Sequence, residues 1–181
     1  MNGSYDLEGV IWHQHSNKLM VKILELWPDK GVPVKDLGCG HNFYCNVLRY
    51  AGYDAEGYDA TVLNKSINII DLTRPIQPGY IGPKFNTISL EVGEHLPSEF
   101  ENIYLDNLTV GGLDIIMSWA LPGQAGVGHI NCQSNEWVIS RMYDRGYILD
   151  HDKTRELRIA VNGCHCTWFQ NTLMYFKPKQ K

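Results

Sequence analysis

The segment that most constrains the fold is a short strand-like stretch that turns at two glycines and continues into an amphipathic run. Residues 34–40 read Val-Lys-Asp-Leu-Gly-Cys-Gly, so an acid, Asp36, stands at the end of the predicted strand. Phe43, Val47 and Leu48 then recur at helical spacing. Glycine has no Cβ, so at such a turn the backbone can approach a ligand closely and can adopt a positive φ. This order of strand, glycine turn and helix predicts an open α/β sheet that binds a ligand at the carboxyl ends of its strands.

Two common nucleotide-binding motifs do not fit this turn. A dinucleotide-binding turn needs a third glycine at the position of Phe43, and no G-x-x-x-x-G-K-[ST] sequence occurs in the chain. Residues 36–40, Asp-Leu-Gly-Cys-Gly, instead resemble the first motif of the class I S-adenosylmethionine-dependent methyltransferases. Residues 91–96, Glu-Val-Gly-Glu-His-Leu, are similar to a segment that follows the fourth strand in many small-molecule members of that family. The resemblance covers residues 17–177.

An acid at the end of the second predicted strand has the spacing expected for a ribose ligand. Residues 55–59 read Ala-Glu-Gly-Tyr-Asp, and Asp59 lies about twenty residues after the glycine turn. A carboxylate there can accept hydrogen bonds from two ribose hydroxyls. The alternative is a strand-end acid that is exposed to water. The glycine turn favours the ribose interpretation.

The resemblance implies S-adenosylmethionine as the cofactor and assigns further residues to it. The glycine turn with Asp36 would hold the methionine and ribose end, and residues 71–72 would hold the adenine. The backbone after the fourth strand would frame the sulfonium. The cofactor-binding residues implied in this way are Asp36, Gly38, Cys39, Gly40, Asp59, Asp71, Leu72, Leu90 and Glu91.

Strand-like and helix-like segments alternate along the chain, which predicts an α/β fold with a mostly parallel sheet covered by helices on both faces. The resemblance implies a three-layer Rossmann-like sandwich with seven strands, the last of them antiparallel. Ser16, Ser134 and Asp152 are predicted N-caps of helices, and Ser98 with Glu101 forms a predicted capping box. The predicted strands lie near residues 32–37, 55–59, 67–70, 87–90, 113–119, 147–149 and 173–176.

The length and composition of the chain fit a single domain. A chain of 181 residues can bury a sizeable core, so residues 1–181 are expected to form one methyltransferase domain, with residues 1–15 as an N-terminal cover and 178–181 as a flexible tail. The net charge of −4 provides no basic surface for a nucleic acid, and no apolar run is long enough for a membrane span. Five cysteines without a secretion signal are expected to be reduced thiols in the cytoplasm.

Histidine is the side chain expected to take the proton of a hydroxyl acceptor, because its usual pKa lies near neutral pH. His129 lies in a glycine-rich loop after the fifth predicted strand, and His95, next to Glu94, follows the fourth. Both positions lie at the edge of the sheet where the resemblance places the substrate. Either His129 or the Glu94–His95 pair is therefore the candidate general base. The alternative for the pair is a brace in the loop before the next helix.

Other polar residues are candidates for the acceptor site. Trp12 and His15 could form a lid that excludes water, or could simply pack on the sheet edge. Gln124 and Asn131 are natural hydrogen-bond partners for a polyol. No metal site is expected, because Cys-His-Cys at residues 164–166 is too short for a zinc knuckle and has no second pair. Magnesium prefers carboxylates and water to histidine.

These features together predict a methyltransferase that modifies a hydroxyl of a sugar, a glycan or another small polar acceptor. The reaction would be an in-line displacement assisted by histidine. Residues 119–131 resemble a segment of small methyltransferases, some of them viral, that are suspected of glycan modification. The alternatives are an N-methyltransferase acting on protein or RNA, and a catalytically inactive methyltransferase fold that binds a partner.

Overall fold

The centre of the molecule is one mixed β-sheet. The computed structural model describes residues 14–180 except 62, 64 and 78, and within them seven strands lie in the order β3-β2-β1-β4-β5-β7-β6. Trp12, and with it most of the predicted N-terminal cover, lies outside the described residues. The strands are β1 (Val34–Leu37), β2 (Ala55–Asp59), β3 (Ile67–Ile69), β4 (Phe85–Ser89), β5 (Gly112–Met117), β6 (Tyr147–Leu149) and β7 (Met174–Pro178).

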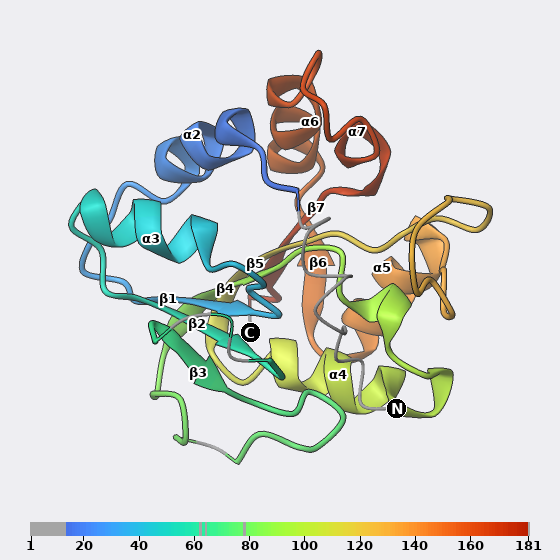
Figure 1. The fold of residues 1–181 in the computed structure, drawn as a ribbon, viewed down its shortest axis with the longest axis horizontal. Helices are drawn as coiled ribbons and strands as arrows, with labels where there is room; N and C mark the ends of the chain where they lie inside the picture. Colours follow the sequence, from blue (N-terminus) through green and yellow to red (C-terminus); the bar gives the residue numbers. More distant parts are fainter. Residues whose placement is uncertain (1–13, 62, 64, 78, 181) are drawn as a thin grey trace.

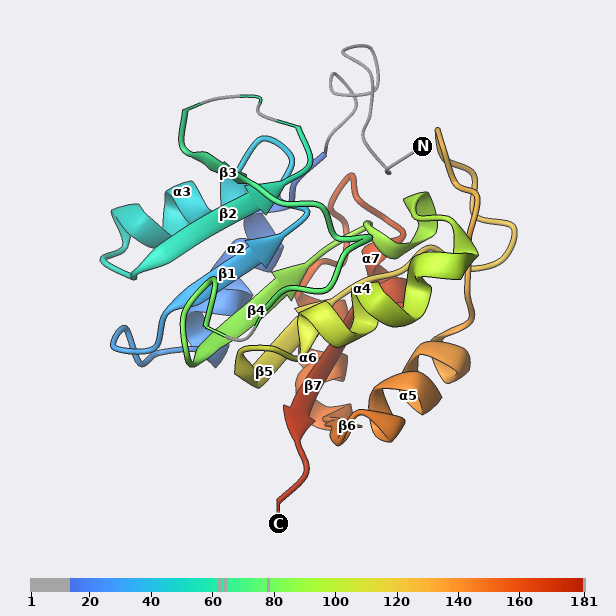
Figure 2. The ribbon, with the colours of Figure 1, turned by 90° about the horizontal axis from the view of Figure 1, so that it is seen from below.

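All neighbouring strands run parallel except where β7 takes part. Strands β1 to β5 pair in parallel, whereas β7 is antiparallel to both β5 and β6. Figure 2 shows β7 between these two strands, with β6 at the edge of the sheet. The predicted sheet of seven strands with an antiparallel last strand is therefore confirmed.

Helices cover both faces of the sheet and make three layers (Figure 1). One face carries the helices α2 (Asn17–Leu26), α3 (Phe43–Tyr50), α6 (His151–Ala160) and α7 (Phe169–Thr172). The opposite face carries α4 (Glu101–Leu108) and α5 (Asn135–Asp144), preceded by the short 3-10 turns η1 (Gly93–His95) and η2 (Ser98–Phe100).

Two hydrophobic cores result, one on each face of the sheet. Successive side chains of a strand point to opposite faces, and β5 shows this directly: Ile115 packs in the core under α4 and α5, and Ile116 in the core under α2 and α3. Both are fully buried. Burial of one such side chain stabilises the fold by about 1.5–3 kcal/mol, so the central strands hold both layers of helices together.

The helix caps agree with the sequence prediction at two helices and differ at two. Ser16 and Ser134 each accept a hydrogen bond from a backbone amide of the first turn, as predicted. In α6 the cap is Asp150, whose carboxylate accepts from the amide of Lys153, and not Asp152, because the helix begins one residue earlier than Asp152. The predicted capping box at Ser98 is also wrong, because Ser98 lies inside η2 and no side-chain cap forms there.

Two further observations concern the described helices and the cysteines. Within the described ranges no helix has the length and apolar character that crossing a membrane requires. All five cysteines carry free thiols, and Cys39, Cys45 and Cys166 are buried.

The core under α4 contains a hydrogen-bonded polar pair that can be tested. Ser89 Oγ donates to the carbonyl oxygen of Leu37 at 2.6 Å, and the Tyr104 hydroxyl lies 2.8 Å from the same Oγ. All three residues are fully buried. We expect Tyr104→Phe to lower the free energy of unfolding by about 1–2 kcal/mol, because Ser89 Oγ loses the hydrogen bond with the tyrosine hydroxyl inside the core and keeps only the one to Leu37. Urea denaturation followed by circular dichroism measures this change.

Tyr147→Phe is the matched control for that experiment. Its hydroxyl reaches the carbonyl oxygen of Thr109 only at 3.5 Å, which is too long for a strong hydrogen bond. The control is expected to cost less than about 0.5 kcal/mol. Equal losses in the two variants would show that the Ser89–Tyr104 contact contributes nothing.

Candidate functional site

A cavity of about 290 Å³ lies at the carboxyl ends of the central strands, near the lower end of the size range for small-molecule sites. The chain leaves β1 toward β2 on one side, while β4 lies on the other side of β1. In open α/β sheets this change of direction is where ligands bind. Most of the predicted site residues line the cavity, namely His15, Asp36, Gly38, Cys39, Asp59, Leu72, Leu90, Glu91, His95, Gln124 and His129.

The glycine turn after β1 packs directly against the loop after β4. Gly38 has a φ of 89°, and a Cβ at this position would lie 2.4 Å from Cγ2 of Val92. Both the backbone conformation and the contact therefore require glycine. Gly57 in β2 is similarly close to Asn42, whose amide nitrogen donates to the carbonyl oxygen of Ser66 at 2.9 Å. These contacts fix the turn against its neighbours on both sides.

Asp59 at the end of β2 holds the glycine turn through its carboxylate. Oδ2 accepts from the amide of Gly40 at 2.9 Å, and Oδ1 accepts from the amide of Thr61 at 3.0 Å. A carboxylate oxygen can accept a second hydrogen bond, and Asp59 lines the cavity. Asp59 is therefore positioned to receive two hydroxyl donors from a ligand. Gly40 does not line the cavity, and it contributes by fixing Asp59.

Asp36 lies deep in the cavity wall and is only 2% exposed. Its Oδ2 has no hydrogen-bond partner among the described residues. Burial raises the pKa of Asp36 to about 8, and the negative charge of Asp59 contributes to the shift. A buried carboxylate without a partner is costly, so this position favours a ligand that brings a positive charge or a hydrogen-bond donor.

Two further acids meet behind the loop that follows β4. Glu91 has a φ of 54°, its amide donates to Ser118 Oγ at 2.8 Å, and its Oε2 accepts from Gln124 Nε2 at 3.0 Å. Glu94 is fully buried in η1. Burial raises the pKa of Glu94, and the nearby Glu91 carboxylate raises it further. Burial also raises the pKa of Glu91.

The two candidate histidines lie side by side. The ring centroids of His95 and His129 are 5.0 Å apart, in an edge-to-face arrangement. His95 Nδ1 lies 3.1 Å from the carbonyl oxygen of Gly128, and His129 Nδ1 lies 3.2 Å from that of Gln124. A carbonyl only accepts, so in the neutral rings each Nδ1 carries the proton and each Nε2 carries the lone pair. Gly126 packs against the ring of His129, where a Cβ would lie only 2.1 Å from Nε2 and 2.2 Å from Cε1.

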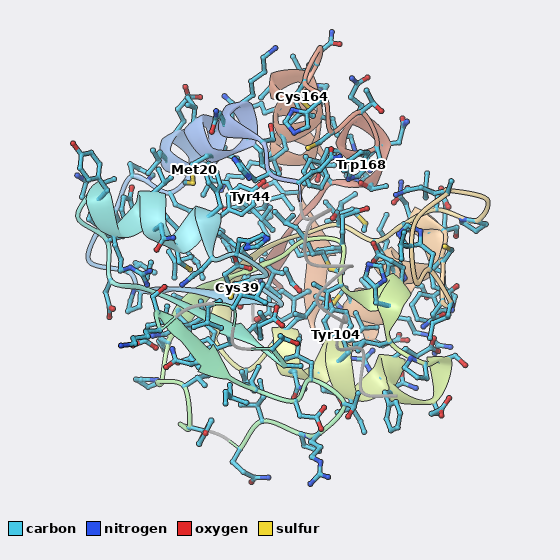
Figure 3. The ribbon with its side chains drawn as sticks, viewed as in Figure 1. Met20, Cys39, Tyr44, Tyr104, Cys164 and Trp168 are labelled. Carbon is cyan, nitrogen blue, oxygen red and sulfur yellow. The ribbon has the colours of Figure 1, made fainter. Side chains whose placement is uncertain are left out.

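An aromatic rim surrounds part of the cavity, and of its residues only His15 was predicted from the sequence to belong to the site. The ring of His15 stacks on Phe43 with centroids 3.8 Å apart. Tyr44, Trp168 and Phe169 also line the cavity. Figure 3 shows Tyr44 and Trp168 on the side of the sheet that carries α3 and α7. Phe43 could have been predicted to lie in this rim, because it stands where a dinucleotide-binding turn has its third glycine. Trp168 is so distant in the chain that its position at the cavity could not be predicted from the sequence.

Three predicted site residues have side chains that do not line the cavity. The Asp71 carboxylate accepts from the amide and hydroxyl of Thr73 and pairs with Arg74, so the structure gives no support to its predicted contact with adenine. Asn131 is 5% exposed, and its Oδ1 accepts from Gln133 at 2.8 Å. Its backbone carbonyl accepts from the indole of a buried tryptophan. Glu94 lies behind the cavity wall rather than in it.

Replacing Asp36 tests its buried, protonated state. An unfolded aspartate loses its proton near pH 4, whereas folded Asp36 keeps its proton until about pH 8. The contribution of Asp36 to the free energy of unfolding is therefore fully present below pH 4. It falls as the pH rises toward 8, by about 1.4 kcal/mol per pH unit. We expect Asp36→Asn to gain stability relative to the wild type between pH 5 and pH 8. Urea denaturation at both pH values measures the gain. The control Asp54→Asn, at an exposed position, should differ from the wild type by the same free energy of unfolding at pH 5 and at pH 8. The same pH-independent difference in Asp36→Asn would show that the Asp36 carboxyl group is already ionised at pH 5.

Comparisons with known proteins identify the fold. No family model matches the sequence, and no curated protein matches it. Magnesium protoporphyrin IX methyltransferase from Synechocystis, solved with S-adenosylhomocysteine, matches at a TM-score of 0.60 and 15% identity, over 94% of this chain and 91% of that one.

Two other solved structures show the same likeness. The 1,6-didemethyltoxoflavin-N1-methyltransferase of Burkholderia thailandensis matches at a TM-score of 0.57 and 9% identity, over 91% of this chain and 79% of that one. A small RNA methyltransferase matches at 0.60 and 12% identity, over 91% of this chain and 25% of that one. Identities this low establish the fold alone: the chain has the Rossmann-like fold of the S-adenosylmethionine-dependent methyltransferases.

Proposed function

We propose that this protein is an S-adenosylmethionine-dependent methyltransferase that acts on a hydroxyl of a sugar, a glycan or another small polar acceptor in the cytoplasm. The observation that carries the proposal is the cavity at the switch point of the sheet, where Asp36, Gly38 and Asp59 meet. Solved structures with this fold hold S-adenosylmethionine or S-adenosylhomocysteine.

The residues that line the cavity fit the parts of that cofactor. Asp59 would accept hydrogen bonds from the ribose hydroxyls. Each of its carboxylate oxygens is held by one backbone amide, and each can accept a second hydrogen bond. The unpartnered Asp36 carboxylate would hold the cationic amino group of the methionine end. Leu72 and Ile70 offer an apolar surface for the adenine. When bound, the cofactor supplies an electrophilic methyl carbon on a sulfonium.

The chain itself would supply positioning, water exclusion and a base. The rim formed by Phe43, Tyr44 and Trp168 is suited to exclude water from the cavity. His129 Nε2 carries the lone pair in the neutral ring, and this ring lines the cavity. We therefore favour His129 as the group that accepts the proton of the acceptor hydroxyl, with His95 as the alternative. Gln124 lines the same region and would hydrogen-bond the acceptor.

The rival functions are weaker on physical grounds. Methylation of RNA would require contacts to phosphates, and the net charge of −4 argues against a basic surface. The intact Asp-Leu-Gly-Cys-Gly turn, with Asp59 bound to the amide of Gly40, argues against a fold that has lost its cofactor site. The resemblance of residues 119–131 to small methyltransferases suspected of glycan modification supports a glycan as the acceptor.

Calorimetric titration with S-adenosylhomocysteine tests the cofactor assignment. We expect binding of one molecule per chain, and a loss of affinity of at least about tenfold in Asp59→Ala, because two hydrogen bonds to a charged group are removed. The exposed Asp54→Ala serves as the control and should bind like the wild type. Unchanged affinity in Asp59→Ala would remove this residue from the site, and a wild-type protein that does not bind would contradict the whole proposal.

The same titration has a predicted pH dependence. Free Asp36 keeps its proton until about pH 8, whereas a cationic amino group beside it would favour the ionised form. Binding then releases a proton, so the affinity should rise between pH 6 and pH 8, by at most about tenfold per unit. In Asp36→Asn the rise should disappear. A wild-type affinity that is constant over this range would show that Asp36 does not face the amino group.

A further inference from the structure

A compact group of metal-ligating side chains lies at one end of the cavity. Glu94, His95 and His129 each place one ligand atom within 4.8 Å of the other two. They come from two loops, one after β4 and one after β5. The amides of Ile130 and Asn131 both donate to the carbonyl oxygen of Glu94, at 2.9 and 3.0 Å. The backbone therefore holds the three side chains together.

Among the described residues, no lysine or arginine forms an ion pair with the carboxyl groups of this cluster. Glu94 is fully buried, and neither of its carboxyl oxygens has a hydrogen bond of normal geometry among the described residues, while the carboxyl group of Glu91 lies next to it. One oxygen of the adjacent Glu91 is also unpartnered. Every salt bridge found in the described part of the chain involves other acids. Two buried carboxyl groups in contact need a shared proton or a cation to neutralise their charge, and a bound metal cation would take the place of that proton.

The two histidines are oriented as metal ligands usually are. A ligating imidazole commonly donates its other ring N–H to a backbone carbonyl, which fixes the tautomer and the direction of the lone pair. His95 and His129 both have this arrangement, through the carbonyl oxygens of Gly128 and Gln124. Gly126 packs against the ring of His129, and the absence of a Cβ permits this close contact.

We propose that Glu94, His95 and His129 bind a divalent transition-metal ion, with the Glu91 carboxylate next to it. Two imidazoles and a carboxylate suit manganese, iron or zinc, whereas magnesium and calcium prefer oxygen ligands. Metal–ligand bonds of about 2.1 Å place ligand atoms about 3–4 Å apart. Small rotations of the side chains from their present separation of up to 4.8 Å would complete the site.

The position of the proposed site indicates which part of the protein a bound ion would face. His95, His129 and Glu91 line the cavity, while Glu94 lies behind them. Coordination positions not taken by the protein would therefore face the cavity. If the proposed methyltransferase function holds, an oxygen of the acceptor would occupy one of them. This would select acceptors whose oxygens can bind a metal ion. In that case a histidine serves the reaction as a metal ligand rather than as a free base.

Manganese binding to the full chain tests the site without any need for an acceptor. After treatment with a chelator and its removal, Mn²⁺ is titrated and the free ion is followed by electron paramagnetic resonance. We expect one ion per chain and at least about tenfold weaker binding in Glu94→Gln and in His129→Asn. The exposed residues Glu99 and His151 provide the matched controls Glu99→Gln and His151→Asn, which should bind like the wild type.

The outcomes separate this site from the cofactor site. Circular dichroism shows whether each variant is folded. If Glu94→Gln does not fold, the Mn²⁺ affinity of His129→Asn tests the proposal. Displacement of Mn²⁺ by Zn²⁺ in the wild type is also expected. Failure of both ions to bind, or undiminished binding in the folded variants, overturns the proposal even if S-adenosylhomocysteine binds. Metal binding without S-adenosylhomocysteine binding would contradict only the proposed function.

Discussion

The close contact between Gly38 and Val92 is the constraint on which the rest of the site depends. It brings the turn after β1 against the loop after β4, and the absence of a Cβ at position 38 makes this approach possible. In this turn the amide of Gly40 donates a hydrogen bond to the Asp59 carboxylate. The loop, held in place, brings Glu91 and His95 to the wall of the same cavity, with Glu94 behind them. One missing side chain thus aligns the two halves of the site.

Electrostatics give the site its second organising principle. Asp36, Glu91 and Glu94 are all withdrawn from water, and burial raises the pKa of each. Such groups reduce the stability of the free protein, because their ionised forms are poorly solvated. A cationic ligand at either end of the cavity would offset part of that cost. The arrangement is typical of a protein that trades stability for binding.

The fold could be predicted from the sequence because it depends on local patterns. The strands at residues 55–59 and 147–149 have the predicted bounds, and Ser16 and Ser134 cap their helices as expected. The start of helix α6 was harder to predict, because Asp150 and Asp152 are both plausible N-caps. Only the structure shows that Asp150 is the cap.

The site could be predicted only where it follows from the order of the strands. Asp59 is the last residue of β2 and Asp36 the last but one of the neighbouring parallel strand β1, so the sequence places both at the same edge of the sheet. The aromatic rim contains Trp168, whose position depends on how the chain folds back after α6. The cluster of Glu94 and His129 depends on backbone hydrogen bonds between two loops, and no spacing rule describes these. For that reason the cluster could not be predicted from the sequence.

The placement of β7 has a consequence for the order of assembly during synthesis. Strand β6 pairs with β7 and with no other described strand, and β7 follows β6 in the chain. When β6 emerges from the ribosome, the edge of β5 to which it will be joined is still bare. The strand that fills the gap ends at Pro178. Until that strand arrives, β5 exposes an unpaired, strongly apolar edge of the kind that invites aggregation, so this side of the sheet is the one that a nascent chain must protect.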